Sequence, residues 1–466
     1  MFKRCLLIPA IVLASIYCAV VSCKKTSSDV SMYYLDTINI AGLNISQYDS
    51  IWPEYSNIEI KKGNIYLKEP LKLSPDSLHT KLYIAVNGEY KKIPLNIRCW
   101  KNDVYRLKEV NKTNNFFNRV ERYYYNHFRD KSEFKRHFFN PVLLSGKNIN
   151  YFVSDGILKK IDGANETELS SVTLQDPMYN QMIVDGAFGI IRSGNKIIFS
   201  DDSLSSWSEI YAGPRQIKES MFWNNQDSTL LFSQYTPGKV RNRHYILKYD
   251  YIKNNIDTVF TFYTEKEFLE KGLSPCARHI HVLTVDPYTG WIFIGTGDTD
   301  NESAIYVSEN KGTSFLKIGG GAQVWRTLSF IFTKNYIYWN TDSDAPQYLS
   351  RVPRKALDKL PVNPDSIIRY PLFNSALWNT IQYGDITLMT SNVEGALYDR
   401  NRRIYGIKFN KSGDPVVYNL WEEKGDTWSS QLFPIGIDKD GLFQFYDTQN
   451  MKYRYFMLQD KNGNRL

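Results

Sequence analysis

The chain has 466 residues and five cysteines, and its 57 lysine and arginine residues against 49 aspartate and glutamate residues give a net charge of +8. The cysteines outside the N-terminal segment, Cys99 and Cys276, are too few for a disulfide scaffold or a cysteine zinc site. The positive balance favours acidic partners. Aromatic residues make up 15% of the chain and include 33 tyrosines, a richness that suits β-strands and sugar-binding surfaces.

The first 22 residues have the features of an export signal. Lys3 and Arg4 precede the apolar run Cys5–Val21, which is shorter than the roughly 20 residues that a membrane span needs. The run closes with Val20-Val21-Ser22-Cys23, which resembles the lipobox of bacterial lipoproteins. The resemblance implies lipidation of Cys23, a tether over 23–30 and an anchor in the outer membrane, on its periplasmic or cell-surface side. An ordinary secretory signal and a single membrane anchor are the alternatives.

Two cysteines remain once Cys5 and Cys18 leave with the signal and Cys23 carries lipid. We expect Cys99 and Cys276 to be buried thiols, with a disulfide between them as the alternative.

Residues 31–112 predict a small separate β-domain. Lys81–Val86 reads as a strand, and Asn87-Gly88 after it is a hairpin turn. The alternative is an eighth blade of the repeat described next. The segment Phe117–Phe139 interleaves basic and aromatic residues, a pattern that can stack on nucleic acid. Its mixed charge and the predicted export favour a structural strand and loop, so we expect no nucleic-acid partner.

A repeated strand indicates an all-β fold, while helical periodicity is nearly absent. The repeat is an aromatic and aliphatic strand that ends in Ser or Thr with Asp or Asn close behind. Its spacing of about 50 residues falls within the range of propeller blades. We predict a seven-bladed β-propeller over 113–466, with six or eight blades as alternatives and with the last blade closed by a strand from the start of the region. The copies are Tyr151–Asp155, Ile197–Asp202, Leu230–Gln234, Ile292–Asp298, Ile337–Asp344, Thr387–Asn392 and Phe443–Asn450.

The clearest unit, Arg278–Ile318, contains four strand segments and a distinctive last turn. That turn, Ser308-x-Asn310-x-Gly312-x-Ser314-Phe315, resembles the Asp-box, or BNR repeat, of sialidase-like β-propellers. The resemblance implies a structural role for Ser308, Asn310, Gly312 and Phe315, remote from any substrate. A degraded copy runs from Ser200 to Trp207, with Leu204 in place of glycine. The chain has no F/Y-R-x-P tetrapeptide, so the resemblance extends to the fold and not to sialic-acid chemistry.

Blade topology predicts where chemistry lies. The loops between strands two and three (2–3 loops) and the connections from strand four to the next strand one (4–1 connections) meet on one face of a propeller. We predict that arginines there bind a carboxylate or sulfate and that tryptophans stack on sugars. His279, His281 and Asp298 are the candidates for proton transfer. The predicted substrate-binding residues are Arg278, Asp300, Trp325, Arg326, Asp342, Asp344, Trp378 and Asn379.

Two other interpretations of these residues stay open. The histidines can be ordinary inner-strand residues and the acids turn formers. The His-x-His pair with its carboxylates can also hold a metal, but without a third histidine we expect no metal and no other cofactor.

The predicted function is that of an exported, glycan-active lipoprotein. It would act on an anionic polysaccharide or oligosaccharide at the propeller rim, as a glycoside hydrolase or polysaccharide lyase. The alternative is a non-catalytic surface lipoprotein that binds glycan or docks a protein partner on the propeller face.

Overall fold

The computed structural model describes most of the chain after residue 103 and seven strands before it. The described ranges are 30–33, 38–39, 50–53, 58–61, 64–67, 77–86, 89–98, 104–111, 142–145, 149–154, 156–162, 165–174, 180–235, 241–342, 347–373, 376–391, 401–425, 430–437, 440–450 and 452–466. Cys23, Asp344 and the segment Phe117–Phe139 lie outside these residues.

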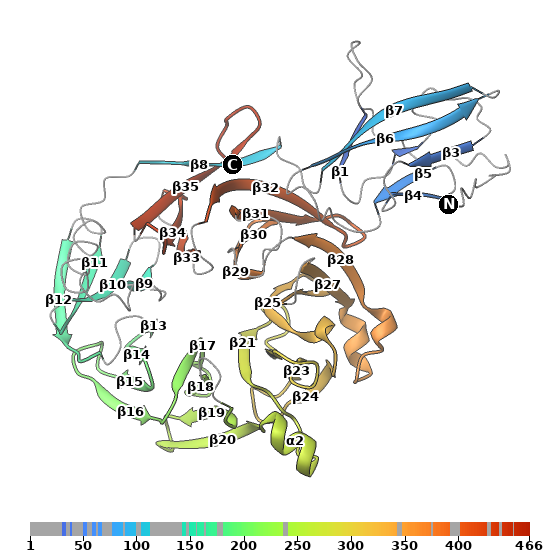
Figure 1. The fold of residues 1–466 in the computed structure, drawn as a ribbon. Coiled ribbons are helices and arrows are strands. Elements are labelled where there is room, and N and C mark those ends of the chain that lie inside the picture. The colour runs from blue at the N-terminus through green and yellow to red at the C-terminus, as the bar shows by residue number, and fades with distance from the viewer. Residues whose placement is uncertain are drawn as a thin grey trace.

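Seven four-stranded antiparallel sheets within the described residues form a ring (Figure 1). The first strand of each sheet is innermost, and these first strands contact one another in order around the ring. The circle is complete because the first strand of the last sheet contacts that of the first. The predicted seven-bladed β-propeller is confirmed.

The strands of each blade follow in order from the innermost to the outermost. Blade 1 is β9 (Val142–Ser145), β10 (Ile149–Ser154), β11 (Ile157–Asp162) and β12 (Asn165–Ser171). Blade 2 is β13 (Asn180–Asp185), β14 (Phe188–Ser193), β15 (Lys196–Ser200) and β16 (Ser208–Ala212). Blade 3 is β17 (Gln216–Asn224), β18 (Thr229–Tyr235), β19 (His244–Asp250) and β20 (Asn255–Phe262). Blade 4 is β21 (His279–Val285), β22 (Ile292–Gly297), β23 (Ala304–Ser308) and β24 (Leu316–Gly320).

The remaining blades follow the same order. Blade 5 is β25 (Thr327–Phe332), β26 (Tyr336–Thr341), β27 (Gln347–Pro353) and β28 (Ile368–Phe373). Blade 6 is β29 (Leu377–Tyr383), β30 (Ile386–Ser391), β31 (Asn401–Phe409) and β32 (Pro415–Lys424). Blade 7 is β33 (Leu432–Ile437), β34 (Phe443–Asp447), β35 (Lys452–Asp460) and β8 (Tyr105–Glu109).

The strand β8 closes the propeller from the far end of the chain. It pairs antiparallel with β35, with Leu107 opposite Leu458 and Glu109 opposite Phe456. β8 covers the outer edge of β35 and gives the last blade the same four strands as the others. The sequence analysis placed these residues in the preceding β-domain, so the propeller begins earlier than the predicted residue 113.

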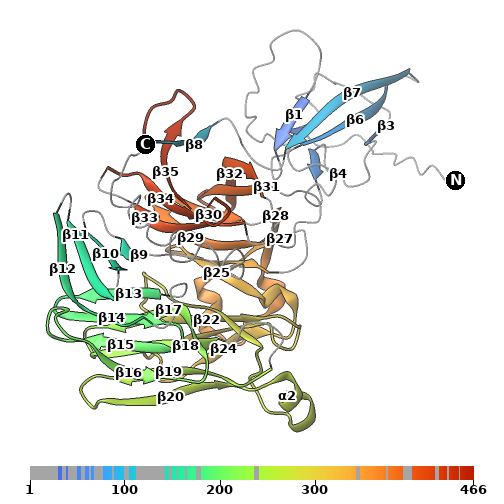
Figure 2. The same cartoon turned by 60° about the vertical axis from the view of Figure 1, so that its left-hand side comes forward.

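Two small sheets precede the propeller and are not part of its ring (Figure 2). One contains β1 (Val30–Tyr33), β7 (Glu89–Arg98), β6 (Ser77–Val86) and β3 (Ser50–Pro53) in that order, and the other contains β2 (Ile38–Asn39), β5 (Asn64–Leu67) and β4 (Ile58–Lys61). Val86 pairs with Glu89, which is the predicted hairpin. These sheets therefore form a separate β-region, and the alternative of an eighth blade is wrong.

Helices are short and lie between strands. Within the described residues, the only α-helix is α2 (Glu265–Lys271), and short 3₁₀ turns are η3 (Gln323–Trp325), η4 (Arg354–Asp358) and η5 (Pro364–Ser366). None of the helices in this part of the chain is long and apolar enough to cross a membrane.

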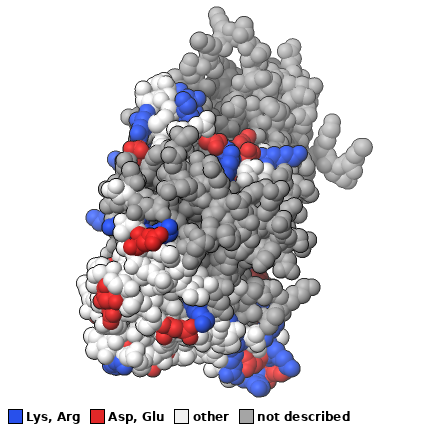
Figure 3. Space-filling model, turned by 90° about the vertical axis from the view of Figure 1, so that its left-hand side faces the viewer, with Lys and Arg blue, Asp and Glu red and all other residues white. Residues whose placement is uncertain are grey.

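The hydrophobic core lies between neighbouring blades. Phe262 of blade 3 packs with Ile280 and Tyr306 of blade 4, and Phe293 of blade 4 packs with Trp339 of blade 5. Cys276 is a buried free thiol, as predicted, while Cys99 lies outside the described residues. On the face shown in Figure 3, basic and acidic side chains are interspersed, and no single sign dominates its described residues.

Six of the seven predicted strand copies are second strands, and one is not. Ile197–Asp202 belongs to β15, the third strand of blade 2, while β14 is the second. Both central strands of a blade are buried on two faces, so both carry the same apolar pattern. The period and composition of a strand in the sequence therefore cannot distinguish a second strand from a third.

The turn Ser308–Phe315 is stabilised by its own side chains. The amide N–H of Gly312 donates to Ser308 Oγ at 2.8 Å, and that of Ser314 donates to Asn310 Oδ1 at 2.9 Å. Gly312 has φ of 81°, a conformation that costs glycine little, and Phe315 is buried. The turn joins strands three and four of blade 4, on the face opposite the 2–3 loops.

The degraded copy in blade 2 makes the same hydrogen bonds. The N–H of Leu204 donates to Ser200 Oγ at 3.1 Å, and that of Ser206 donates to Asp202 Oδ1 at 3.0 Å. Leu204 has φ of 72° and is buried. Apolar burial thus compensates for the strained backbone that leucine adopts where blade 4 has glycine.

Candidate functional site

The candidate site lies where blades 4 and 5 present the starts of their inner strands and the ends of their second strands. His279 pairs with Gly297, which brings Arg278 beside Asp298. Thr327 pairs with Thr341, which brings Arg326 beside Asp342 in the same way. We call Arg278, Arg326, Asp298 and Asp342 the rim cluster.

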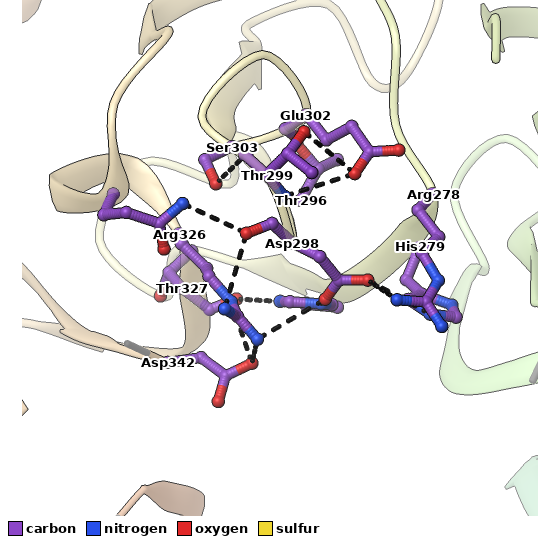
Figure 4. A network of polar contacts seen from close by, with 12 residues as sticks. Arg278, His279, Thr296, Asp298, Thr299, Glu302, Ser303, Arg326, Thr327 and Asp342 are labelled. Carbon is purple, nitrogen blue, oxygen red and sulfur yellow. Dashed lines mark hydrogen bonds and ion pairs between the residues drawn. The ribbon is translucent and has the colours of Figure 1, made fainter. Parts of the chain in front are cut away.

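Asp298 is the centre of the rim cluster (Figure 4). Its Oδ2 atom is 2.9 Å from Arg278 Nη1 and 3.4 Å from His279 Nε2. Its Oδ1 atom is 3.4 Å from Arg326 Nη2 and 3.5 Å from His281 Nε2. Burial alone would raise the pKa of Asp298, but contact with His281 and the nearby positive charges outweigh it and hold that pKa well below its usual range. The carboxylate is therefore ionised.

His279 is a buried, neutral imidazole. Its ring stacks between those of Tyr235 and His281, with centroids 5.1 Å and 6.2 Å away. Burial lowers its pKa to about 3, and the charge of Asp298 offsets this only in part. His279 Nδ1 has no hydrogen-bond partner among the described residues.

Arg326 bridges the two aspartates. Its Nε and Nη2 atoms donate to Asp342 Oδ2 at 3.1 Å and 2.8 Å, and Nη2 also contacts Asp298. The side chains of Arg278 and Arg326 are each 23% exposed, against 18% for Asp298 and 17% for Asp342. The formal charges of the two arginines and the two aspartates sum to zero.

The 2–3 loop of blade 4 is held rigidly beside the cluster. Gln323 Nε2 donates to the carbonyl of Asp298 and to Asp300 Oδ1, both at 3.0 Å. Glu302 is fully buried, pairs with Arg241 and accepts from the Thr299 N–H at 3.2 Å. The loop therefore presents Asp298 in a fixed position.

The structure brings together most of the residues predicted for the site. Arg278, His279, His281, Asp298, Arg326 and Asp342 share one cluster, and Asp300 lies next to it through Gln323. Trp378 and Asn379 lie in the inner strand β29 of blade 6. The structure does not describe the side chains of Trp378 and Asn379 or any part of Asp344.

The prediction that Trp325 stacks on a sugar is wrong. Its side chain is 2% exposed and lies parallel to Trp339, with ring centroids 5.5 Å apart. The 3₁₀ turn η3 directs this indole into the core between blades 4 and 5, while its neighbour Arg326 points to the rim. Trp325 is structural.

Sequence reasoning missed two groups that shape the site. Tyr235, which stacks on His279, follows the strand copy Leu230–Gln234 directly and so ends a second strand as the aspartates do. The place of Tyr235 at the end of a second strand could have identified it as a residue of the site. The backbone carbonyl of Thr327, which holds His281, has no sequence signal at all.

Comparisons with known proteins give no family for this chain. No protein-family model matches it, and no curated protein sequence matches it significantly. Similar solved structures include the hydrazine synthase of Kuenenia stuttgartiensis, at 10% identity and a TM-score of 0.46 over 72% of this chain and 98% of that one. They also include an oligogalacturonate lyase in complex with manganese, at 12% identity and a TM-score of 0.44 over 69% of this chain and 88% of that one. A prolyl endopeptidase matches at 12% identity and a TM-score of 0.42 over 74% of this chain and 55% of that one. Similarities this low assign no function.

Proposed function

We propose that this protein is a binding protein for anionic carbohydrate, and that the rim cluster is its binding site. The observation that carries the proposal is the pair of partly exposed guanidinium groups, Arg278 and Arg326, placed on either side of one carboxylate by two neighbouring blades. A guanidinium donates two parallel hydrogen bonds to a carboxylate or sulfate, which a saccharide with uronate, sialate or sulfate groups supplies.

Binding is favoured over cleavage by the protonation states in the cluster. A general acid or base works best when its pKa lies near the working pH. The pKa of His279 is lowered to about 3, and the pKa of Asp298 is well below its usual range. Neither group holds a proton to donate near neutral pH, so neither would supply the general acid that cleavage of a glycosidic bond needs.

The protein would be anchored at the bacterial outer membrane. The charged start, apolar run and Cys23 of the N-terminal segment support a lipoprotein of the bacterial outer membrane. A lipid-anchored propeller would hold captured glycan at that membrane.

Isothermal titration calorimetry tests the binding site. Trigalacturonate, a sulfated heparin tetrasaccharide, sialyllactose and neutral maltotriose are titrated into wild type, Arg326→Ala and Arg326→Lys. Lys253→Ala is the matched control, because Lys253 is an exposed cation in the turn between strands three and four of blade 3. We expect at least one anionic saccharide to bind, with about 10–100-fold loss in Arg326→Ala and a smaller loss in Arg326→Lys.

Two outcomes would reject the proposal. If no saccharide binds, the function is wrong. If Arg326→Ala binds every saccharide as well as Lys253→Ala does, the site is misplaced.

A further inference from the structure

The ring orientation of His281 is fixed by a backbone carbonyl. Its Nδ1 atom lies 3.1 Å from the carbonyl oxygen of Thr327, which can only accept, so Nδ1 carries the proton. In the neutral ring, Nε2 then presents a lone pair to Asp298 Oδ1, 3.5 Å away. In that tautomer two acceptor atoms face each other 3.5 Å apart, an arrangement that a cation between them would satisfy, and Arg326 Nη2 lies 3.4 Å from the same Asp298 oxygen.

The spacing of these atoms suits a metal ion. Two ligands on a tetrahedral zinc ion with bonds of about 2.1 Å lie roughly 3.4 Å apart. The separation of His281 Nε2 and Asp298 Oδ1 is 3.5 Å, and a carboxylate oxygen of Asp342 completes a set of three ligand atoms that all lie within 4.8 Å of one another.

The surroundings of the ligands match those of metal sites. A metal-binding histidine usually donates its other ring N–H to a carbonyl or carboxylate, as His281 does to Thr327. Arg278 holds the second oxygen of Asp298 at 2.9 Å and so orients the first oxygen toward His281. The side chain of His281 is 7% exposed, which keeps its Nε2 from being satisfied by bulk water.

We propose that His281, Asp298 and Asp342 form a binding site for one divalent transition-metal ion of the Zn²⁺ or Mn²⁺ class, and that this ion competes with Arg326. One imidazole and two carboxylates suit these ions, and a water molecule or ligand would occupy a remaining position. Arg326 Nη2 contacts both aspartates, so its guanidinium holds the cation position that the metal would take.

The exchange would change the charge of the rim cluster. Two arginines and two aspartates sum to zero, and adding one divalent ion makes the sum +2. Arg326, released from both aspartates, would be available to an anionic ligand. Metal and anionic saccharide would therefore bind with positive coupling. This coupling rests on the proposed function, but the metal site does not.

Calorimetry with ZnCl₂ and MnCl₂ on chelator-treated protein tests the site, with total metal measured by mass spectrometry after dialysis. We expect one ion per chain in wild type and in Glu309→Gln, the matched control, because Glu309 is an exposed carboxylate in the turn between strands three and four of blade 4, on the opposite face. His281→Gln and Asp342→Asn should each weaken binding by about 10-fold or more. Arg326→Ala should bind metal more tightly than wild type because it removes the competing cation. Circular dichroism establishes that each variant is folded.

The outcomes separate the two proposals. Failure of wild type to bind one ion, unchanged binding in His281→Gln and Asp342→Asn, or weaker binding in Arg326→Ala would overturn the metal site. If metal does not bind and trigalacturonate binds equally well with chelator or ZnCl₂, the proposed carbohydrate binding stands and the metal site is rejected. If metal binds and no saccharide does, the metal site stands and the function falls.

Discussion

Two arginine–carboxylate clusters lie on the same face of the propeller and differ in how deeply their arginines are buried. The rim cluster leaves its four side chains 17–23% exposed. The second cluster, which we call the closure network, joins Arg402, Arg454, Asp447, Glu423 and Glu109. There Arg402 and Asp447 are fully buried, and Arg402 donates to both oxygens of Asp447, at 2.5 Å and 2.9 Å.

The closure network ties the closing strand to the ring. Arg454 of β35 donates from Nε to Glu109 of β8 at 2.9 Å, and from Nη1 to Glu423 of blade 6 at 2.6 Å. Burial would lower the pKa of Arg454, but its hydrogen bonds to Glu109 and Glu423 raise it overall. Glu423 and Glu109 are 39% and 36% exposed, so the two clusters differ in the burial of their arginines and not of every carboxylate. Identical chemistry therefore serves the fold where the arginines are buried, and is available to a ligand where they stay partly exposed.

Breaking the closure network should have the largest effect. Replacing Arg454 by alanine leaves Asp447 with one fewer partner in a buried site, which we expect to cost about 3–5 kcal/mol of unfolding free energy. Urea denaturation measures this, with Arg106→Ala on the exposed side of β8 as control, expected within about 0.5 kcal/mol of wild type. Glu109→Gln provides a milder variant if Arg454→Ala does not fold. Equal stability of Arg454→Ala and Arg106→Ala would contradict a structural role.

Acid should destabilise the protein through His279. The pKa of an unfolded histidine is about 6.5, and burial lowers the pKa of His279 to about 3 in the folded state. Its stabilising contribution is thus complete above about pH 6.5 and is lost as pH falls toward 3, by up to about 1.4 kcal/mol per pH unit. Urea unfolding at pH 7, 6 and 5 should show a shallower decline for His279→Gln than for wild type. Identical declines would mean that His279 is already charged in the folded state.

A substitution in the turn Ser308–Phe315, on the opposite face, should change stability without changing ligand binding. In Gly312→Ala, alanine must adopt φ of 81°, and its Cβ lies 3.1 Å from Leu231 Cδ1. We expect the free energy of unfolding to fall by about 1–2 kcal/mol. Saccharide and metal binding should stay as in wild type. A loss of either ligand in folded Gly312→Ala would show that the two faces are coupled.

Loosening the rim cluster should cost the least stability. Asp342→Asn removes one partly exposed partner of Arg326, which keeps its contact with Asp298. We expect a change of about 1 kcal/mol or less in unfolding free energy. A cost as large as that of Arg454→Ala would place the rim cluster among the structural networks instead.

The sequence indicated the blade number because each blade contributes one recognisable buried central strand, the second strand in six blades and the third in blade 2. It predicted closure of the last blade by an early strand but did not identify that strand, since Tyr105–Glu109 has a single buried residue, Leu107, and pairs with β35 across most of the chain. No local sequence pattern predicts a pairing between strands so far apart in the chain. Blade topology did place Arg278 and Asp298 on the same face of the propeller, because starts of first strands and ends of second strands meet there.

Burial was the property that the sequence could not supply. Asp298 and Asp447 both end second strands, yet one is partly exposed and the other is enclosed by Arg402 and Arg454 from two other strands. Trp325 and Arg326 are neighbours whose side chains point in opposite directions, which depends on η3 and on the indole of Trp339.

The most direct test of the distinction is one comparison of Arg326→Ala with Arg454→Ala, or with Glu109→Gln if needed, in which saccharide affinity and unfolding free energy are measured on the same preparations. We predict that Arg326→Ala loses about 10–100-fold in affinity for an anionic saccharide with a small change in stability. The closure variant should lose stability and keep its affinity. Unchanged affinity in Arg326→Ala, or equal loss of affinity in both folded variants, would contradict the assignment of the rim cluster as the binding site.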